Sequence, residues 1–186
     1  MVLNRNLTVV RLFIAIDIPD ELKRTLGSLR VEIPGLRWVP TSQIHLTLAF
    51  LGDVENAGVD QLAGELSRIH SPAFKLRFAG TGCFPDRRRP RVVWIGLEPE
   101  PRLRVLADKV RAAILACGIP LETRPFSPHI TLARFKAAPS CDCDDFLDPR
   151  FLLRLPPFSV REFTLFQSRL DSHGAVHTPI KHFQLQ

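Results

Sequence analysis

The chain has 186 residues, of which 45% are hydrophobic and 24% charged, and no segment is long and apolar enough to cross a bilayer. This length suffices for one sizeable domain or two small lobes that share a core. The excess of 25 Lys and Arg over 19 Asp and Glu gives a formal net charge of +6. Such a charge favours polyanionic partners such as nucleic acid, although many proteins carry it without one.

The first part of the chain predicts a strand, a helix and a second strand. Residues 11–18 are rich in Phe, Ile and Leu and indicate a buried strand rather than a signal peptide, since no small-residue cleavage site follows. We therefore expect a cytoplasmic protein. Asp20 can cap a helix whose apolar positions run to Leu29. Residues 44–51 indicate a second strand, which Gly52 ends.

Hydrophobic periodicity and turn residues predict the remaining elements. In chain order these are a helix at 59–69, a strand at 74–79, a basic turn at 85–91, a strand at 92–97, a helix at 103–115 stopped by Gly118, a strand at 129–135, an irregular stretch at 137–157, and strands at 160–168 and 176–183.

A strand–helix–strand unit occurs twice. The first copy ends in the text His-Leu-Thr-Leu-Ala from His45, and the second ends in His-Ile-Thr-Leu-Ala from His129. This duplication predicts two similar lobes related by an approximate two-fold axis. No linker separates independent domains, so we expect residues 1–186 to form one domain of two interleaved lobes.

Strand geometry gives the repeated text a chemical meaning. Residues two apart in a strand share a face, so His45 lies with Thr47, and His129 with Thr131. Strict alternation sends Leu46, Leu48 and Phe50 to the opposite, core face. It leaves small alanines, Ala49 and Ala133, beside the His/Thr pairs, where they leave room for a ligand.

Two such histidines suit phosphodiester hydrolysis. Histidine has an ordinary pKa of about 6.5, so one imidazole can take a proton from water while the other gives one to the departing oxygen. Threonine hydroxyls can hydrogen-bond the non-bridging phosphate oxygens. A single His-x-Thr is a common tripeptide, but two copies at equivalent places of a duplicated unit favour the catalytic interpretation.

Metal and nucleophile chemistries are the competing interpretations. A catalytic zinc needs three protein ligands, and neither motif has an Asp, Glu or further His at ligand spacing. We expect no metal and no other cofactor. The remaining histidines are predicted to be structural or exposed: His70, His173, His177 and His182. No nucleophile elbow is present. Four cysteines fit no zinc pattern and are expected to be reduced thiols: Cys83, Cys117, Cys141 and Cys143.

On these motifs the chain resembles the 2H phosphoesterase superfamily, and within it the RNA 2′,3′-cyclic phosphodiesterases, also called 2′-5′ RNA ligases. The resemblance covers nearly the whole chain, with the motifs in the family's order. The matching segments are residues 11–17, 45–52, 91–96, 125–134, 164–168 and 178–181.

This resemblance implies a bilobal α+β fold in which two antiparallel sheets line a central cleft, with helices outside. It implies that RNA 2′,3′-cyclic phosphate ends are opened to 2′-phosphates. His45 would be the proton donor and His129 the proton acceptor, with Thr47 and Thr131 on the phosphate. It also implies 2′-5′ joining of RNA, tRNA halves among them, as the reverse reaction. We expect a monomer with no obligate protein partner and no membrane association.

Other positions carry weaker expectations. The resemblance places Arg134 near the phosphate, but alternation puts it opposite His129 unless a bulge follows Thr131. An aromatic residue is common in the family where His177 stands. Phe13 and Phe126 are candidates for base stacking or for core packing, and the arginines at 87–89 for steering RNA or for a solvated turn. A 2H enzyme for 2′-5′ oligonucleotides or cyclic nucleotide derivatives, and a non-catalytic RNA-binding module, are the alternatives.

Overall fold

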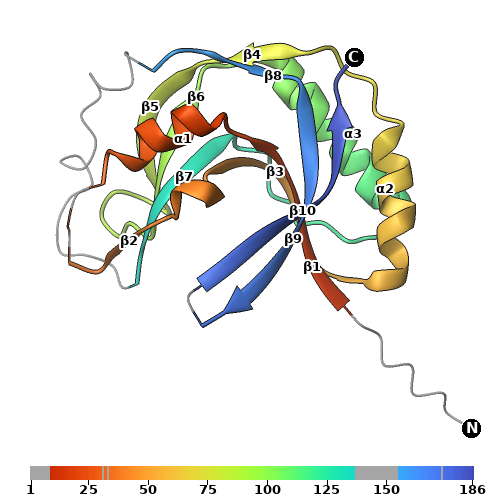
Figure 1. Cartoon of the computed structure of the whole chain (residues 1–186), viewed down its shortest axis with the longest axis horizontal. Helices are drawn as coiled ribbons and strands as arrows, with labels where there is room; N and C mark the ends of the chain where they lie inside the picture. Colours follow the sequence, from red (N-terminus) through yellow and green to blue (C-terminus); the bar gives the residue numbers. More distant parts are fainter. Residues whose placement is uncertain (1–8, 31, 33, 137–154, 173) are drawn as a thin grey trace, which may run out of the picture.

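The computed structural model of the chain describes residues 9–30, 32, 34–136, 155–172 and 174–186 (Figure 1). Its elements are β1 (Val9–Asp17), α1 (Asp20–Gly27), β2 (Leu36–Trp38), η1 (Thr41–Gln43), β3 (His45–Glu55), η2 (Asn56–Gly58), α2 (Val59–Ser67), β4 (Phe74–Leu76), β5 (Phe78–Phe84), β6 (Val92–Leu97), α3 (Pro101–Ala116), β7 (His129–Phe135), β8 (Phe158–Val160), β9 (Glu162–Asp171) and β10 (Gly174–Gln184). Within these ranges, no helix has the length and apolar character needed to cross a membrane.

Two antiparallel sheets and the helices around them form the fold. Eight strands make the larger sheet, in the order β10-β9-β1-β3-β7-β6-β5 with β2 also paired to β7, while β4 and β8 make the smaller one. The predicted α+β class is confirmed. Only one residue pair, Leu46 with Ile130, joins β3 to β7, so the larger sheet consists of two halves that meet there. The helices lie outside the sheet (Figure 1).

The predicted duplication is visible in the strand pairing. The unit β1–α1–β3 sets β1 antiparallel to β3, and the unit β6–α3–β7 sets β6 antiparallel to β7. In the first unit Asp17 pairs with His45, and in the second Gly96 pairs with His129. Each motif histidine therefore stands at the same place in its unit, beside the last part of the preceding strand.

A β-bulge follows each His-x-Thr motif. The register of β1 with β3 skips Leu48, and the register of β6 with β7 skips Leu132. The extra residue at a bulge reverses the face of the sheet on which the following side chains lie, so strict alternation fails after each threonine. Phe50, predicted for the core, is 64% exposed, and Ala133, predicted for the open face, is fully buried. Arg134 is exposed instead, through the bulge that its placement required.

Three predicted boundaries were wrong for local reasons. Gly52 does not end β3: it adopts φ +70° at a further bulge, and pairing with β1 continues to Glu55. Asp20 is the first residue of α1, and Pro19, not Asp20, occupies the capping position. The strand expected at 74–79 divides into β4, which pairs with β8, and the start of β5, which pairs with β6. Most of the irregular stretch at 137–157 lies outside the described residues.

Candidate active site

The two motifs lie side by side at the centre of the larger sheet. Leu46 and Ile130 are antiparallel partners and both are fully buried, so the residues flanking them point to the opposite face. This register sets His45 across from Thr131, and Thr47 across from His129. All four flanking residues are partly exposed. The structure thus brings together the four residues that the sequence singled out.

The ring of His45 is held by two hydrogen bonds. Its Nδ1 lies 2.7 Å from the carbonyl oxygen of Gln43, and its Nε2 lies 3.1 Å from Oγ1 of Thr47. A carbonyl oxygen can only accept, so the proton of the neutral ring is on Nδ1. Nε2 then accepts from the Thr47 hydroxyl, and its lone pair faces the threonine side of the motif.

His129 is held in the same way. Its Nδ1 donates to the carbonyl oxygen of Ser127 at 2.8 Å. In both motifs the acceptor is the carbonyl oxygen two residues before the histidine. The two neutral rings therefore carry their proton on the same nitrogen, Nδ1. Each neutral ring has an unprotonated Nε2, the atom that can take or carry a proton toward a ligand.

Burial lowers the pKa of both motif histidines. The pKa of His45 falls from its ordinary value of 6.5 to about 4: burial is the largest cause, and the nearby His177 and Lys23 also lower it, while the hydrogen bond to Gln43 and the charge of Asp17 raise it. The pKa of His129 is also lowered, by burial and then by the Arg134 charge, against the hydrogen bond to Ser127. At neutral pH both rings are therefore neutral before an anion binds.

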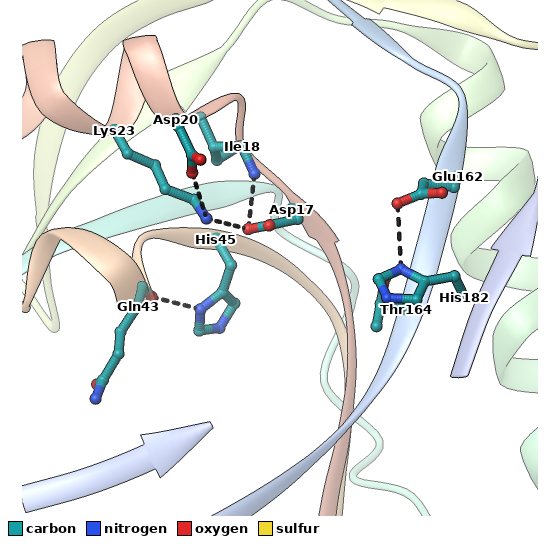
Figure 2. Close-up of polar contacts among 9 residues, drawn as sticks. All are labelled: Asp17, Ile18, Asp20, Lys23, Gln43, His45, Glu162, Thr164 and His182. Atoms are coloured by element: carbon teal, nitrogen blue, oxygen red, sulfur yellow. Dashed lines mark hydrogen bonds and ion pairs between the residues drawn. The ribbon is translucent and has the colours of Figure 1, made fainter. Parts of the chain in front are cut away.

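A lysine, Lys23, lies near His45 on the side of Asp17, as Figure 2 shows. Lys23, on α1, has a side chain only 7% exposed, and its Nζ lies 2.6 Å from Oδ1 of Asp17 and 3.7 Å from Oδ1 of Asp20. Asp17 also accepts the backbone N–H of Ile18 at 3.0 Å. Because Asp17 is the strand partner of His45, this pair sets the charge beside that ring. The sequence analysis missed both residues, although antiparallel pairing of β1 with β3 would have placed Asp17.

His177 lies beside His45, a position that its interpretation as a structural or exposed residue did not predict. Its ring centroid is 5.3 Å from that of His45 and 4.7 Å from that of Phe13. Phe13 is 2% exposed and also stacks on Phe166 at 5.0 Å, so it packs beneath the two imidazoles and has no face open to a base. Burial lowers the pKa of His177.

Aromatic side chains also support His129. Phe84 meets its ring edge-on, with centroids 4.9 Å apart, and Trp94 lies 6.2 Å away. Trp94 is the strand partner of Thr131. Its indole covers Gly82 so closely that a Cβ there would stand 2.3 Å from a ring carbon. The absence of a side chain at Gly82 therefore leaves the space that the indole occupies beside the second motif.

A cleft with a volume of about 1030 Å³ opens beside His129. We call it the α3 cleft, because α3 forms one wall; the residues before His129 form another. Thr47 and His129 are among its lining residues, whereas His45 and Thr131 are not. Its other lining residues include Phe50, Phe84, Arg91, Arg104, Ala107, Asp108, Arg111, Glu122, Arg124 and Phe126.

The described residues offer no alternative centre. No three His, Cys, Asp or Glu side chains among them gather to hold a metal ion. His182 has Thr164 Oγ1 at 3.0 Å and Glu162 Oε1 at 3.2 Å, but both meet the same nitrogen, Nδ1. A catalytic triad needs the carboxylate and the hydroxyl on two different ring nitrogens of the histidine, so these three residues are not a triad. They also lie apart from His45 in Figure 2. Cys83 and Cys117 are not joined in a disulfide.

The sequence of the chain matches that of a known family. Residues 16–94 and 95–177 each match the model described as LigT-like phosphoesterase, so both halves of the duplication are recognised in turn. The chain belongs to the LigT-like phosphoesterase family, which confirms the resemblance read from the motifs.

Its relatives include proteins named RNA 2′,3′-cyclic phosphodiesterase. One from Thermus thermophilus is 37% identical, with 95% of this chain and 91% of the relative covered, and one from Escherichia coli is 34% identical, with 94% and 96% covered. A longer one from Geobacillus stearothermophilus is 34% identical, and the chain spans 52% of its length. The crystal structure of E. coli LigT complexed with 3′-AMP superposes with a TM-score of 0.80, 31% identity and coverage of 96% and 99%.

Proposed function

We propose that this chain hydrolyses the 2′,3′-cyclic phosphate end of RNA to a 2′-phosphate end by acid–base catalysis from His45 and His129. The observation that carries this is the register of β3 with β7, which sets two equally oriented imidazoles and two threonines around one position. The names of the relatives favour the same substrate class.

His129 is the base in this mechanism. Its Nδ1–H is fixed to the Ser127 carbonyl, so Nε2 is unprotonated at neutral pH and can take a proton from the attacking water. The nearby Arg134 charge keeps that nitrogen unprotonated and helps to hold the anionic phosphate. As the water oxygen bonds to phosphorus, the P–O3′ bond breaks and the 2′-phosphate remains.

His45 is the acid, and the substrate charges it. In the unliganded protein its pKa of about 4 leaves few rings protonated at neutral pH. A phosphate anion next to the ring favours the imidazolium, as any opposite charge within a few ångströms does. Asp17 raises the pKa of His45 and so favours the protonated ring that acts as the acid. The imidazolium gives its Nε2 proton to the departing 3′ oxygen, while Thr47 and Thr131 donate hydrogen bonds to the non-bridging oxygens.

The same chemistry can join RNA when an alcohol takes the place of water. A 5′-hydroxyl that replaces water at His129 attacks the cyclic phosphate and yields a 2′–5′ bond. RNA ends, tRNA halves among them, are the proposed partners in the cytoplasm. No metal or other cofactor takes part, and the arrangement of two neutral imidazoles supports this because each proton transfer has a side-chain partner.

The deciding experiment is incubation with a short RNA that ends in a 2′,3′-cyclic phosphate, with the product end identified by phosphorus NMR. We expect a 2′-phosphate at equal rates with and without EDTA. A 3′-phosphate would mean that the leaving oxygen is wrong, and loss in EDTA with recovery on zinc would favour a metal. Turnover of 2′–5′ dinucleotides alone would favour the other 2H substrates, and tight RNA binding without turnover the non-catalytic module.

A further inference from the structure

The α3 cleft lies on one side of the reaction centre. His129 and Thr47 line it, while the His45 ring lies against the rings of Phe13 and His177. In the proposed reaction the group that enters at phosphorus approaches from the His129 side, and the 3′ oxygen departs on the His45 side, while the nucleoside stays bonded to phosphorus through O2′. The cleft therefore opens where the attacking oxygen comes from.

Its size exceeds what hydrolysis requires. An attacking water occupies about 30 Å³, and clefts that bury a drug-sized ligand measure about 300–1,000 Å³. The α3 cleft has about 1030 Å³. A site that served water alone would need no such volume next to the base.

The lining of the cleft suits a nucleic acid strand. Four arginines line it against two carboxylates: Arg91, Arg104, Arg111 and Arg124 against Asp108 and Glu122. Two aromatic side chains also line it: Phe50, which is 64% exposed, and Phe126, which is half-buried and packs partly against the core. Cations that follow a backbone and aromatic rings that stack on bases are the usual combination for single strands.

Of the four arginines that line the cleft, Arg104 makes the fewest polar contacts with the described residues. Arg111 donates to the carbonyl of Glu122 at 3.0 Å, Arg124 lies 3.6 Å from the Glu122 carboxylate, and Arg91 donates to the carbonyl of Lys136. No described residue hydrogen-bonds or ion-pairs with the guanidinium of Arg104, which lines the cleft from α3.

We propose that the α3 cleft binds a second RNA strand with its 5′-hydroxyl end at His129, and that Arg104 contacts the phosphates of that strand. The inference rests on the proposed function. The 5′-hydroxyl oxygen forms the new bond to phosphorus and gives its proton to Nε2 of His129. The P–O3′ bond breaks, and Nε2–H of His45 protonates O3′, so a 2′–5′ phosphodiester and a 3′-hydroxyl result.

The test compares Arg104→Glu with Arg102→Glu. Both residues are exposed on α3 and both substitutions change the charge equally, but Arg102 does not line the cleft. Each full-length protein receives an oligonucleotide with a 2′,3′-cyclic phosphate, an acceptor oligonucleotide with a 5′-hydroxyl, and, separately, 2′,3′-cyclic CMP. We expect Arg104→Glu to lower the ratio of joining to hydrolysis at least tenfold, and Arg102→Glu to keep the wild-type ratio. Circular dichroism checks that both variants are folded.

Three results would overturn the inference. One is an equal ratio in the two variants. Another is no joining by the wild type at saturating acceptor. The third is that Arg104→Glu slows hydrolysis of the long cyclic-phosphate RNA as much as joining while sparing cyclic CMP, which would assign the cleft to the body of the donor RNA. If the wild type hydrolyses no cyclic phosphate at all, the proposed function itself has failed.

Discussion

At the scale of single residues, the protonation of His45 depends on what surrounds its ring. Its Nδ1–H is bound to the Gln43 carbonyl, so any second proton must go to Nε2, beside Thr47. Burial lowers the pKa of the ring, whereas the charge of Asp17 raises it. The ring is therefore neutral in the free protein, and in the proposed mechanism an incoming phosphate favours its protonation.

The lowered pKa of His45 makes stability depend on pH. Its pKa is about 4 in the folded chain and 6.5 in the ordinary state, so between these values the unfolded chain binds more protons. This contribution to the free energy of unfolding is fully present above pH 6.5 and decreases as the pH falls. The loss reaches about 3 kcal/mol at pH 4. We expect urea unfolding to show this loss, and His45→Gln to reduce it. Equal slopes for both proteins would contradict the assignment.

Lys23 and Asp17 should move the pKa of His45 in opposite directions. Lys23→Met leaves the Asp17 charge uncompensated beside the ring, so the pKa of His45 should rise; Asp17→Asn should lower it. NMR titration of the ring protons measures both shifts. Lys23→Met should also cost about 1–3 kcal/mol of unfolding free energy, since the ammonium is buried. Asp20→Asn, at an exposed carboxylate, is the control and should cost less than about 0.5 kcal/mol.

At the scale of elements, the shared text His-x-Thr-Leu-Ala encodes a strand followed by a bulge. The skipped leucines, Leu48 and Leu132, are both buried, and the residues after the alanines, Phe50 and Arg134, both face outward. The duplication therefore places an aromatic ring at one site and a cation at the equivalent site. We propose that this difference helps to give the two nearly identical motifs their different roles.

Packing of β5 against β6 should control the second motif. Gly82→Ala would place a methyl group within the Trp94 indole, which must move away from its partner Thr131. We expect kcat to fall about tenfold or more and stability by about 1–3 kcal/mol. Gly64→Ala makes the same change in α2 with no atom within 4 Å, and should stabilise by about 0.5–1 kcal/mol without loss of kcat. Wild-type turnover by Gly82→Ala would refute this role of the indole.

Local patterns in the sequence predicted some features and could not predict others. The bounds of β6 and β7 agree with the alternating apolar residues, because local periodicity decides a strand. The exposure of Phe50 could not be predicted, because it depends on the register with a strand far away in the chain. His177 was missed for the same reason: β10 reaches His45 only through β9 and β1.

At the scale of the whole molecule, the chain crosses between the two halves of the sheet. The half that carries His45 consists of β1 and β3 from the N-terminal part of the chain and β9 and β10 from the C-terminal part. The other half consists of β2, β5, β6 and β7. One contiguous core includes residues of both halves, Leu12 and Leu165 in the first and Ile95 and Leu132 in the second. Separate unfolding of either half would expose this shared core.

We propose that the chain accordingly unfolds as a single domain. Trp38 and Trp94 lie in β2 and β6, within the half that carries His129, whereas far-UV circular dichroism reports on both halves. The two signals should follow one urea transition with the same midpoint. Transitions that do not coincide would show that the halves are independent units.

The central claim is that His45 and His129 act as one catalytic unit. The most direct measurement is kcat on a 2′,3′-cyclic-phosphate oligonucleotide for His45→Ala, His129→Ala and the double variant, with RNA binding measured in parallel. Residues that act as a unit are strongly non-additive, so each single variant should lose at least about 10²-fold and the double variant little more, while binding persists. Wild-type turnover by either single variant would contradict the two-histidine mechanism.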